Sequence, residues 1–121
     1  MIQKERTKQY DLEDRTLAFA KKVRAFVREL PKTLPNIEDA RQLINSSGSV
    51  GANYIEANES LSRKDFTMRI KICRKESKES RYWLRLIETE GDREQEKERC
   101  CLEQEAMELT NIFGSILSKS E

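Results

Sequence analysis

The sequence predicts an all-α protein, namely an antiparallel up-down-up-down four-helix bundle that occupies the chain of 121 residues as a single domain, 1–121. Apolar residues recur at helical spacing in four separate segments, which lie at about 11–30, 36–58, 63–88 and 92–118. No segment shows the alternation of a half-buried strand. Three short connections between four long helices make successive helices antiparallel.

The first segment can be capped by Asp11 and is stopped by Pro31. Its expected buried face is Leu12, Phe19, Val23, Phe26 and Leu30. The second segment can be capped by Asn36, and its expected face is Ala40, Leu43, Ile44, Ser47, Gly51, Tyr54, Ile55 and Asn58. Two glycines within it disfavour a helix by about 1 kcal/mol each. Because the apolar face keeps one phase across residues 46–52, we expect a continuous helix.

The third segment follows Ser62 and Asp65, which have the spacing of a capping box. Its apolar arc is Phe66, Ile70, Ile72, Cys73, Trp83, Leu84 and Ile87. Gly91 is expected to terminate this segment, and Asp92 is expected to cap the fourth. The fourth face is Leu102, Ala106, Leu109, Phe113 and Ile116.

The near-neutral total charge, 23 basic against 22 acidic residues, conceals strong local imbalance. Residues 61–85 carry nine basic and three acidic side chains, whereas residues 86–110 carry three and nine. Seven cations fall within an arc of roughly 120° on the third helix. They form what we call the basic stripe: Lys64, Lys71, Arg74, Lys75, Lys78, Arg81 and Arg85.

The basic stripe has two interpretations. It can follow a nucleic-acid backbone, because phosphate neutralisation needs little besides a row of cations. Alternatively, it is a solvated face that is neutralised by Glu94, Glu96 and Glu98 at the acidic start of the fourth helix, or by a neighbouring subunit. Tyr82 is the one aromatic residue within the arc, so base stacking has little support.

Glu76 projects into the apolar arc of the third helix, and Arg69 lies on the same side two turns earlier. A buried carboxylate needs a partner, so we expect Arg69 and Glu76 to form a structural polar cluster. The other reading is an acid with a raised pKa in a pocket. On the second helix, the small polar residues Ser46, Ser49 and Asn53 lie away from the apolar face, where they would let a second subunit pack closely.

Catalytic and metal chemistry finds little support. The chain has no histidine, and Cys73, Cys100 and Cys101 are odd in number and lack a CxxC spacing. We therefore expect three reduced thiols, no cofactor, no metal and no enzymatic activity. No segment has the roughly 20 apolar residues of a membrane span, and the N-terminus lacks the apolar stretch of a signal peptide. The expected location is the cytoplasm.

Three runs of residues carry a family resemblance: SVGANYIEA at 49–57, SRKDF at 62–66 and KESKESRYWL at 75–84. They resemble the bacterial four-helix-bundle proteins encoded within intervening sequences of large-subunit ribosomal RNA genes, and the related accessory variability proteins of diversity-generating retroelements. The chain has Gly51 where the family commonly has Pro, and Ala57 where Gly is common. The resemblance implies ring-shaped homopentamers without enzymatic activity and, in the retroelement relatives, association with reverse transcriptase and nucleic acid.

The sequence thus favours a non-enzymatic homo-oligomeric scaffold, with a pentamer implied by the resemblance. It would bind RNA or DNA, or a nucleic-acid enzyme such as a reverse transcriptase, through basic surfaces on the first and third helices. The rival hypothesis is a protein–protein interaction module without affinity for nucleic acid.

Overall fold

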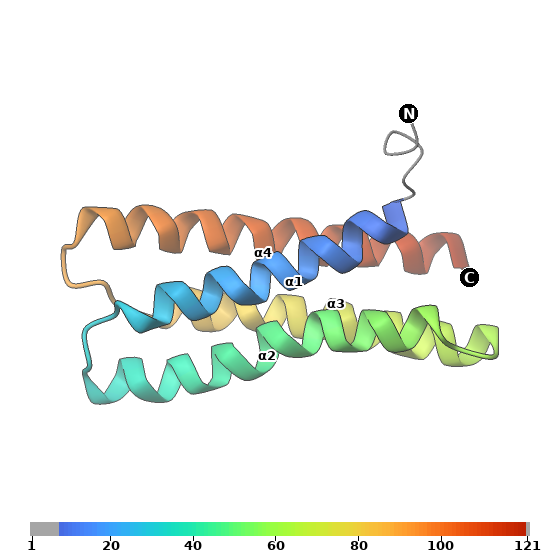
Figure 1. Cartoon of the computed structure of the whole chain (residues 1–121), viewed down its shortest axis with the longest axis horizontal. Helices are drawn as coiled ribbons and strands as arrows, with labels where there is room; N and C mark the ends of the chain where they lie inside the picture. The colour runs from blue at the N-terminus through green and yellow to red at the C-terminus, as the bar shows by residue number, and fades with distance from the viewer. Residues whose placement is uncertain (1–7, 121) are drawn as a thin grey trace.

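Four long α-helices make up the computed structural model, which describes residues 8–120 (Figure 1). They are α1 (Lys8–Arg28), α2 (Leu34–Asn58), α3 (Arg63–Leu86) and α4 (Arg93–Ser120). Successive helices run in opposite directions, so α1 starts and α4 finishes at the same end of the molecule (Figure 1). The predicted all-α four-helix bundle is confirmed.

Two of the four predicted helix caps are wrong. Because α1 already includes Lys8, Asp11 lies inside the helix and does not cap it. The cap of α2 is Thr33, whose hydroxyl accepts a hydrogen bond from the Asn36 N–H at 3.3 Å. Thr33 takes this role in place of Asn36 because the helix starts at Leu34. Pro35 fits in the first turn, since a backbone N–H at that position would have no partner within the helix.

The other two caps are confirmed. Ser62 Oγ accepts from the Asp65 N–H at 3.0 Å, and Asp92 Oδ1 accepts from the Gln95 N–H at 3.0 Å. The third helix ends two residues earlier than expected, at Leu86, and the chain then turns through Gly91, whose φ of 85° favours glycine. These local hydrogen bonds supply partners for N–H groups that a helix start leaves without one.

The glycine-containing part of α2 is helical, as predicted. A Cβ on Gly51 would lie 2.9 Å from Thr16 Oγ1 and 3.3 Å from Thr16 Cβ. The missing side chain therefore lets α1 and α2 approach closely at this point. Gly48 is less crowded, because a Cβ there would meet only the guanidinium end of Arg24, at 3.4 Å.

The core receives apolar side chains from all four helices. The predicted faces of the first and fourth helices are buried, apart from the half-buried Ile116. The rings of Tyr54 and Phe113 pack at a centroid distance of 5.7 Å and join α2 to α4 across the core. The prediction that Ile55 belongs to the buried face is wrong, since 52% of its surface is exposed. Burying each large apolar side chain contributes about 1.5–3 kcal/mol, which explains why the periodicity predicts the fold.

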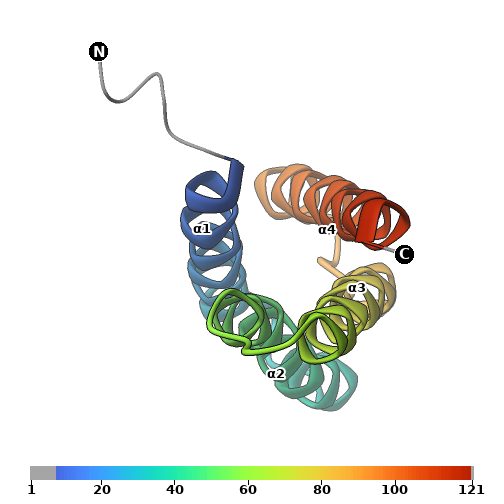
Figure 2. The same cartoon turned by 90° about the vertical axis from the view of Figure 1, so that its right-hand side faces the viewer.

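The helices follow one another around the bundle, so α2 lies between α1 and α3, and α3 lies between α2 and α4 (Figure 2). Helices α1 and α4 make the fewest contacts of any neighbouring pair. Arg15 bridges them through ion pairs with Glu105 and Glu108, each at 2.7 Å. Within the described part of the chain, no helix is both long enough and apolar enough to cross a membrane.

Candidate nucleic-acid interface

The basic stripe lies on the outward surface of α3. Six of its side chains are exposed, and Arg81 is half-buried. The opposite side of α3 packs into the bundle through Ile70, Cys73, Ser77, Ser80 and Leu84. Because packing of that side fixes the rotation of the helix, the cations are turned toward solvent.

The C-terminal part of the stripe is neutralised by α4. Arg81 Nε lies 3.4 Å and Arg85 Nε 3.7 Å from the same oxygen of Glu103. Arg99 Nη1 approaches the other oxygen at 3.4 Å. The neutralising carboxylate within the chain is therefore Glu103, and the expected set of Glu94, Glu96 and Glu98 is wrong for contacts inside the bundle.

Glu96 has a different role. Its carboxylate binds Arg99 of the same helix and accepts a hydrogen bond from Thr89 Oγ1 at 3.0 Å. The Arg99 hydrogen bonds lower the pKa of Glu96 to about 2. This arrangement ties the start of α4 to the connection that precedes it, and the ion pair of Glu96 is with Arg99 of its own helix.

The remaining stripe residues are not held in ion pairs. Among the described residues, no ion pair involves Lys64, Lys71, Arg74, Lys75 or Lys78. Arg74 reaches toward α4, where its Nε would lie 3.4 Å from a Cβ on Gly114. The stripe therefore has two parts. Most of its cations make no ion pair, whereas Arg81 and Arg85 at its C-terminal end are paired with the carboxylate of Glu103.

Tyr82 is the exposed aromatic residue beside the stripe. Its ring meets Trp83 edge-on at a centroid distance of 5.0 Å, and the indole N–H of Trp83 donates to Glu79 at 3.1 Å. One exposed ring offers a single stacking position, whereas single-stranded binding surfaces normally align several. The chemistry of the stripe is accordingly that of phosphate contacts.

The structure does not bring Arg69 and Glu76 together. Arg69 Nη1 donates to Asn53 Oδ1 of α2 at 2.9 Å, and the Asn53 amide donates to Ser49. Glu76 is half-buried, and this burial, followed by the charge of Glu79, raises its pKa, while Lys75 acts in the opposite direction. Seven helical residues separate Arg69 and Glu76 by roughly 10 Å along the axis, which explains why each takes other surroundings.

The polar side of α2 faces α3 of the same chain. Ser46 is only 2% exposed, and its Oγ lies 2.8 Å from Ser80 Oγ. The prediction that Ser46, Ser49 and Asn53 receive a second subunit is therefore wrong for Ser46, and Asn53 is already engaged by Arg69. Small polar residues do permit close packing here, but between two helices of one bundle.

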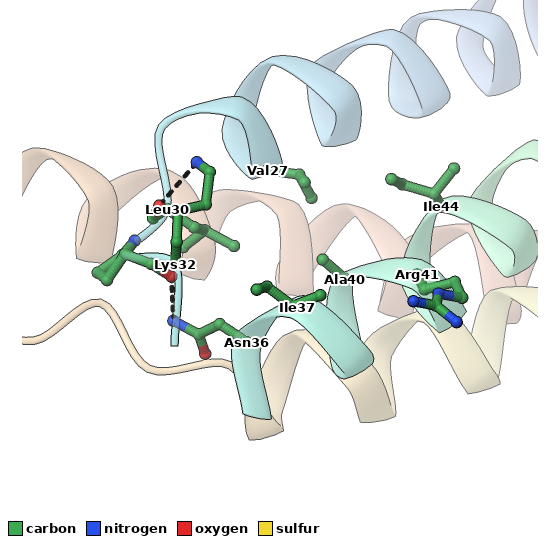
Figure 3. A pocket seen from close by; sticks show the side chains of 9 residues that line it. Val27, Leu30, Lys32, Asn36, Ile37, Ala40, Arg41 and Ile44 are labelled. Carbon is green, nitrogen blue, oxygen red and sulfur yellow. Dashed lines mark hydrogen bonds between the residues drawn. The ribbon is translucent and has the colours of Figure 1, made fainter. Parts of the chain in front are cut away.

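A hollow of about 330 Å³ lies between the end of α1 and the start of α2, and sequence reasoning did not anticipate it. Figure 3 shows Val27 of α1 near Ile37 and Ala40 of α2 within it. Most of its lining is apolar, and Arg41 and Lys32 also line it. The exposed fraction of Ile37, 43%, shows that this apolar surface continues to the outside of the bundle.

Comparison with known proteins identifies the family. A family model described as 23S rRNA-intervening sequence protein matches residues 8–115. The chain belongs to this family. A crystal structure from the S23 ribosomal protein family, of a protein with unknown function from Bacteroides thetaiotaomicron VPI-5482, is similar to the bundle with a TM-score of 0.78. The sequence identity is 31%, and the match covers 93% of this chain and 99% of that chain. No curated protein matches the chain.

The predicted family membership is thus confirmed, whereas the relation to retroelement proteins stays a prediction. In this family member, the runs at 49–57 and 75–84 lie on the adjoining helices α2 and α3. Nearby, Cys73 Sγ donates to the Val50 carbonyl at 3.4 Å, and Ser46 meets Ser80. Among the described residues, no group of three or more His, Cys, Asp or Glu is arranged to hold a metal ion.

Proposed function

We propose that this protein is a non-enzymatic homo-oligomeric scaffold, a pentamer in its assembled form, that binds the phosphate backbone of RNA or DNA through the basic stripe of α3. The single observation that carries the proposal is the row of exposed stripe cations that make no ion pair among the described residues, Lys71 and Lys78 above all. The pentamer is supported by the family resemblance.

Phosphate binding suits this surface for two reasons. Residues three or four apart on a helix are neighbours, so the cations form a continuous row along a rigid rod. Each phosphate that they neutralise releases condensed counterions, which makes affinity fall as salt rises. Since phosphate contacts carry no sequence information, such a protein would bind many sequences about equally.

The test is a titration of labelled RNA at several salt concentrations. Wild type should bind at low salt, with a slope of log affinity against log salt of about −0.7 to −0.9 per phosphate contact. The double reversal Lys71→Glu/Lys78→Glu should weaken binding of all sequences alike and flatten this slope. The matched control, Lys97→Glu/Lys119→Glu on α4, makes the same change in net charge at exposed positions away from the stripe and should bind like wild type. Absence of wild-type binding at low salt ends the nucleic-acid part of the proposal.

The second candidate function is a protein–protein interaction module without affinity for nucleic acid. It is favoured by the pairing of Arg81 and Arg85 with Glu103, which shows that carboxylates fit this surface. An acidic protein surface would then take the place of phosphate. In that case, wild type fails to bind RNA at any salt concentration.

A further inference from the structure

The cations of the basic stripe include one straight line along α3. The members of this line recur every seven residues, at intervals of about 10.5 Å along the helix axis. They are Lys64, Lys71, Lys78 and Arg85. Helix α3 runs unbroken from Arg63 to Leu86, and it contains neither Gly nor Pro. The usual causes of a kink are therefore missing, and the spacing of the line is fixed before a ligand arrives.

The stripe also has width, because Arg74 and Lys75 lie on opposite flanks of this line. Successive residues of a helix are about 100° apart, and the line of Lys71 and Lys78 falls between these two. Arg74 reaches toward α4, where its Nε would lie 3.4 Å from a Cβ on Gly114. An arc of about 120° on a helix about 10–12 Å in diameter is roughly 11 Å wide. The stripe is therefore a two-dimensional patch.

Most acidic side chains of α4 lie on the side of that helix that faces α1. Arg15 of α1 binds Glu105 and Glu108, each at 2.7 Å, which places both on this side. Glu98 lies one heptad before Glu105. Glu94 lies two heptads before Glu108. Residues a heptad apart share a helix face, so these carboxylates are turned away from α3.

The part of α4 beside the stripe is mainly uncharged. Cys100, Gln104 and Met107 line a hollow together with Arg81, and Gly114 adjoins Arg74. Glu103, the acidic side chain in this hollow, is already paired with Arg81. A polyanion can therefore approach the stripe along this side.

On α3 itself, the acidic side chains lie round the helix from the line. Asp65 and Glu79 each follow a lysine of the line by one position, so they are about 100° away from it. Asp65 lines a hollow with Glu56 of α2, and Glu79 accepts a hydrogen bond from the Trp83 indole at 3.1 Å. These contacts hold the carboxylates beside the patch and leave its centre cationic.

We propose that the ligand of the basic stripe is a nucleic-acid duplex, whose two backbones contact the two flanks of α3. A duplex carries about one phosphate charge per 1.7 Å of its axis. Its strands border grooves about 6–12 Å wide, a span that a patch roughly 11 Å wide can match. A single strand offers one track of phosphates and would leave one flank unused. This inference rests on the proposed function and names the class of its ligand.

A single strand also lacks the stacking partners that it needs. Surfaces that bind single strands combine a cationic groove with several aromatic side chains, on which successive bases stack. Tyr82 is the exposed aromatic residue beside the stripe, and the outward side of a helix is convex. A flexible strand would lose conformational freedom here without stacking in return, whereas a duplex is ordered before it binds.

Fluorescence anisotropy of the full chain with three labelled probes tests the proposal. The probes are a duplex RNA, the duplex DNA of the same sequence, and the pyrimidine strand of that RNA alone. At one salt concentration, at least one duplex should bind about tenfold or more tighter than the single strand, which gains no stacking. The tighter duplex identifies the source of the phosphates, since a preference for RNA indicates A-form shape or the 2′-hydroxyl.

The salt dependence counts the contacts. The stripe cations that make no ion pair among the described residues are Lys64, Lys71, Arg74, Lys75 and Lys78. If each contacts one phosphate, the slope of log affinity against log salt on duplex DNA should approach about −4.5.

Two matched double variants separate the flanks from the line. Arg74→Gln/Lys75→Gln removes one charge from each flank, so it should weaken duplex binding more than single-strand binding. Lys71→Gln/Lys78→Gln removes the same charge from the line and should weaken both alike. Tyr82→Ala should bind duplex within about twofold of wild type, because phosphate contacts do not involve base stacking. Circular dichroism checks that each variant is folded.

The outcomes distinguish this inference from the proposed function. If no probe binds at low salt, both are overturned. Single-strand binding as tight as that of either duplex overturns the inference alone, because phosphate binding remains. The inference also fails if Tyr82→Ala loses most of its affinity, or if both double variants change the ratio of duplex to single-strand affinity equally. If Arg74→Gln/Lys75→Gln does not fold, the three probes with wild type decide.

Discussion

The side-chain amide of Asn36 forms two hydrogen bonds with the backbone of Glu88. Its Nδ2 donates to the Glu88 carbonyl at 2.8 Å, and its Oδ1 accepts from the Glu88 N–H at 3.1 Å. The same Nδ2 donates to the Pro31 carbonyl at 3.2 Å. One buried side chain thus links the connection between α1 and α2 to the connection between α3 and α4.

Replacing Asn36 by Ala should destabilise the fold by about 1–3 kcal/mol, because both polar groups of Glu88 lose their partner in a partly buried position. Urea unfolding measures the change. Asn45→Ala on the same helix removes an exposed amide and is the control, with an expected change within about 0.5 kcal/mol. Equal midpoints for the two variants would contradict the assigned role of Asn36.

The two glycines of α2 should respond oppositely to alanine. Gly48→Ala should stabilise the protein by up to about 1 kcal/mol, since alanine favours helix and only a flexible guanidinium must move. Gly51→Ala should destabilise it by about 1–3 kcal/mol, because the new methyl group collides with Thr16. Thermal unfolding of both variants checks this. If the Gly51→Ala variant were more stable than wild type, α1 and α2 would have to lie farther apart at Thr16 than the structure shows.

Glu96 should make the stability depend on pH in the acidic range. Its pKa is lowered from 4.5 to about 2 in the folded protein, so its contribution is fully present above pH 4.5 and disappears as the pH falls toward 2. The difference in melting temperature between wild type and Glu96→Gln should shrink over this interval. Glu94→Gln removes a neighbouring exposed carboxylate and is the control. A difference in melting temperature that stays constant from about pH 6 to about pH 2 would show that Arg99 does not stabilise the Glu96 carboxylate.

Removing the charge of Glu103 should strengthen nucleic-acid binding if the proposed function is right. Glu103→Gln releases Arg81 and Arg85 from their ion pairs, which frees two cations of the stripe to contact phosphate. The salt slope should steepen by about 0.7–0.9 for each phosphate gained. Glu94→Gln changes the net charge equally without releasing either arginine. If both variants bind RNA alike, overall charge explains the effect and the pairing does not.

Thiol reactivity should divide the three cysteines. Cys100 and Cys101 are exposed, whereas Cys73 is buried, and burial raises its pKa to about 12. An aromatic disulfide reagent should therefore modify two thiols rapidly in the folded protein and the third only after denaturation. Rapid reaction of all three would mean that α3 is rotated away from the core.

The sequence predicts the helices well because helix formation depends on local periodicity. Leu12, Phe19 and Val23 mark their own face by spacing alone, and Ser62 caps a helix three residues away. Asn36 was misassigned because its main partner, Glu88, lies 52 residues away in the sequence. Nothing in the local pattern reveals such a contact, and Thr33 could take over the capping role without any change in periodicity.

For the candidate site, the sequence predicts which residues share a face of α3 but not which residues of other helices they contact. The angular positions of Lys71, Lys75 and Lys78 follow from the helical period, so their common face could be calculated. The pairing of Arg81 with Glu103 could not, because it depends on how α4 is rotated against α3. Likewise, the hydrogen bond from Arg69 to Asn53 depends on how α2 packs against α3, which the sequence pattern does not reveal.

The sparse contact between α1 and α4 affects how the chain folds. Helices α2, α3 and α4 form two tightly packed hairpins from segments adjacent in the sequence, and such local contacts form early and fast. Helix α1 docks mainly on α2, so it can be the last element to join and the first to detach. Its amide hydrogens should then exchange with solvent through a partial opening that leaves the other three helices intact.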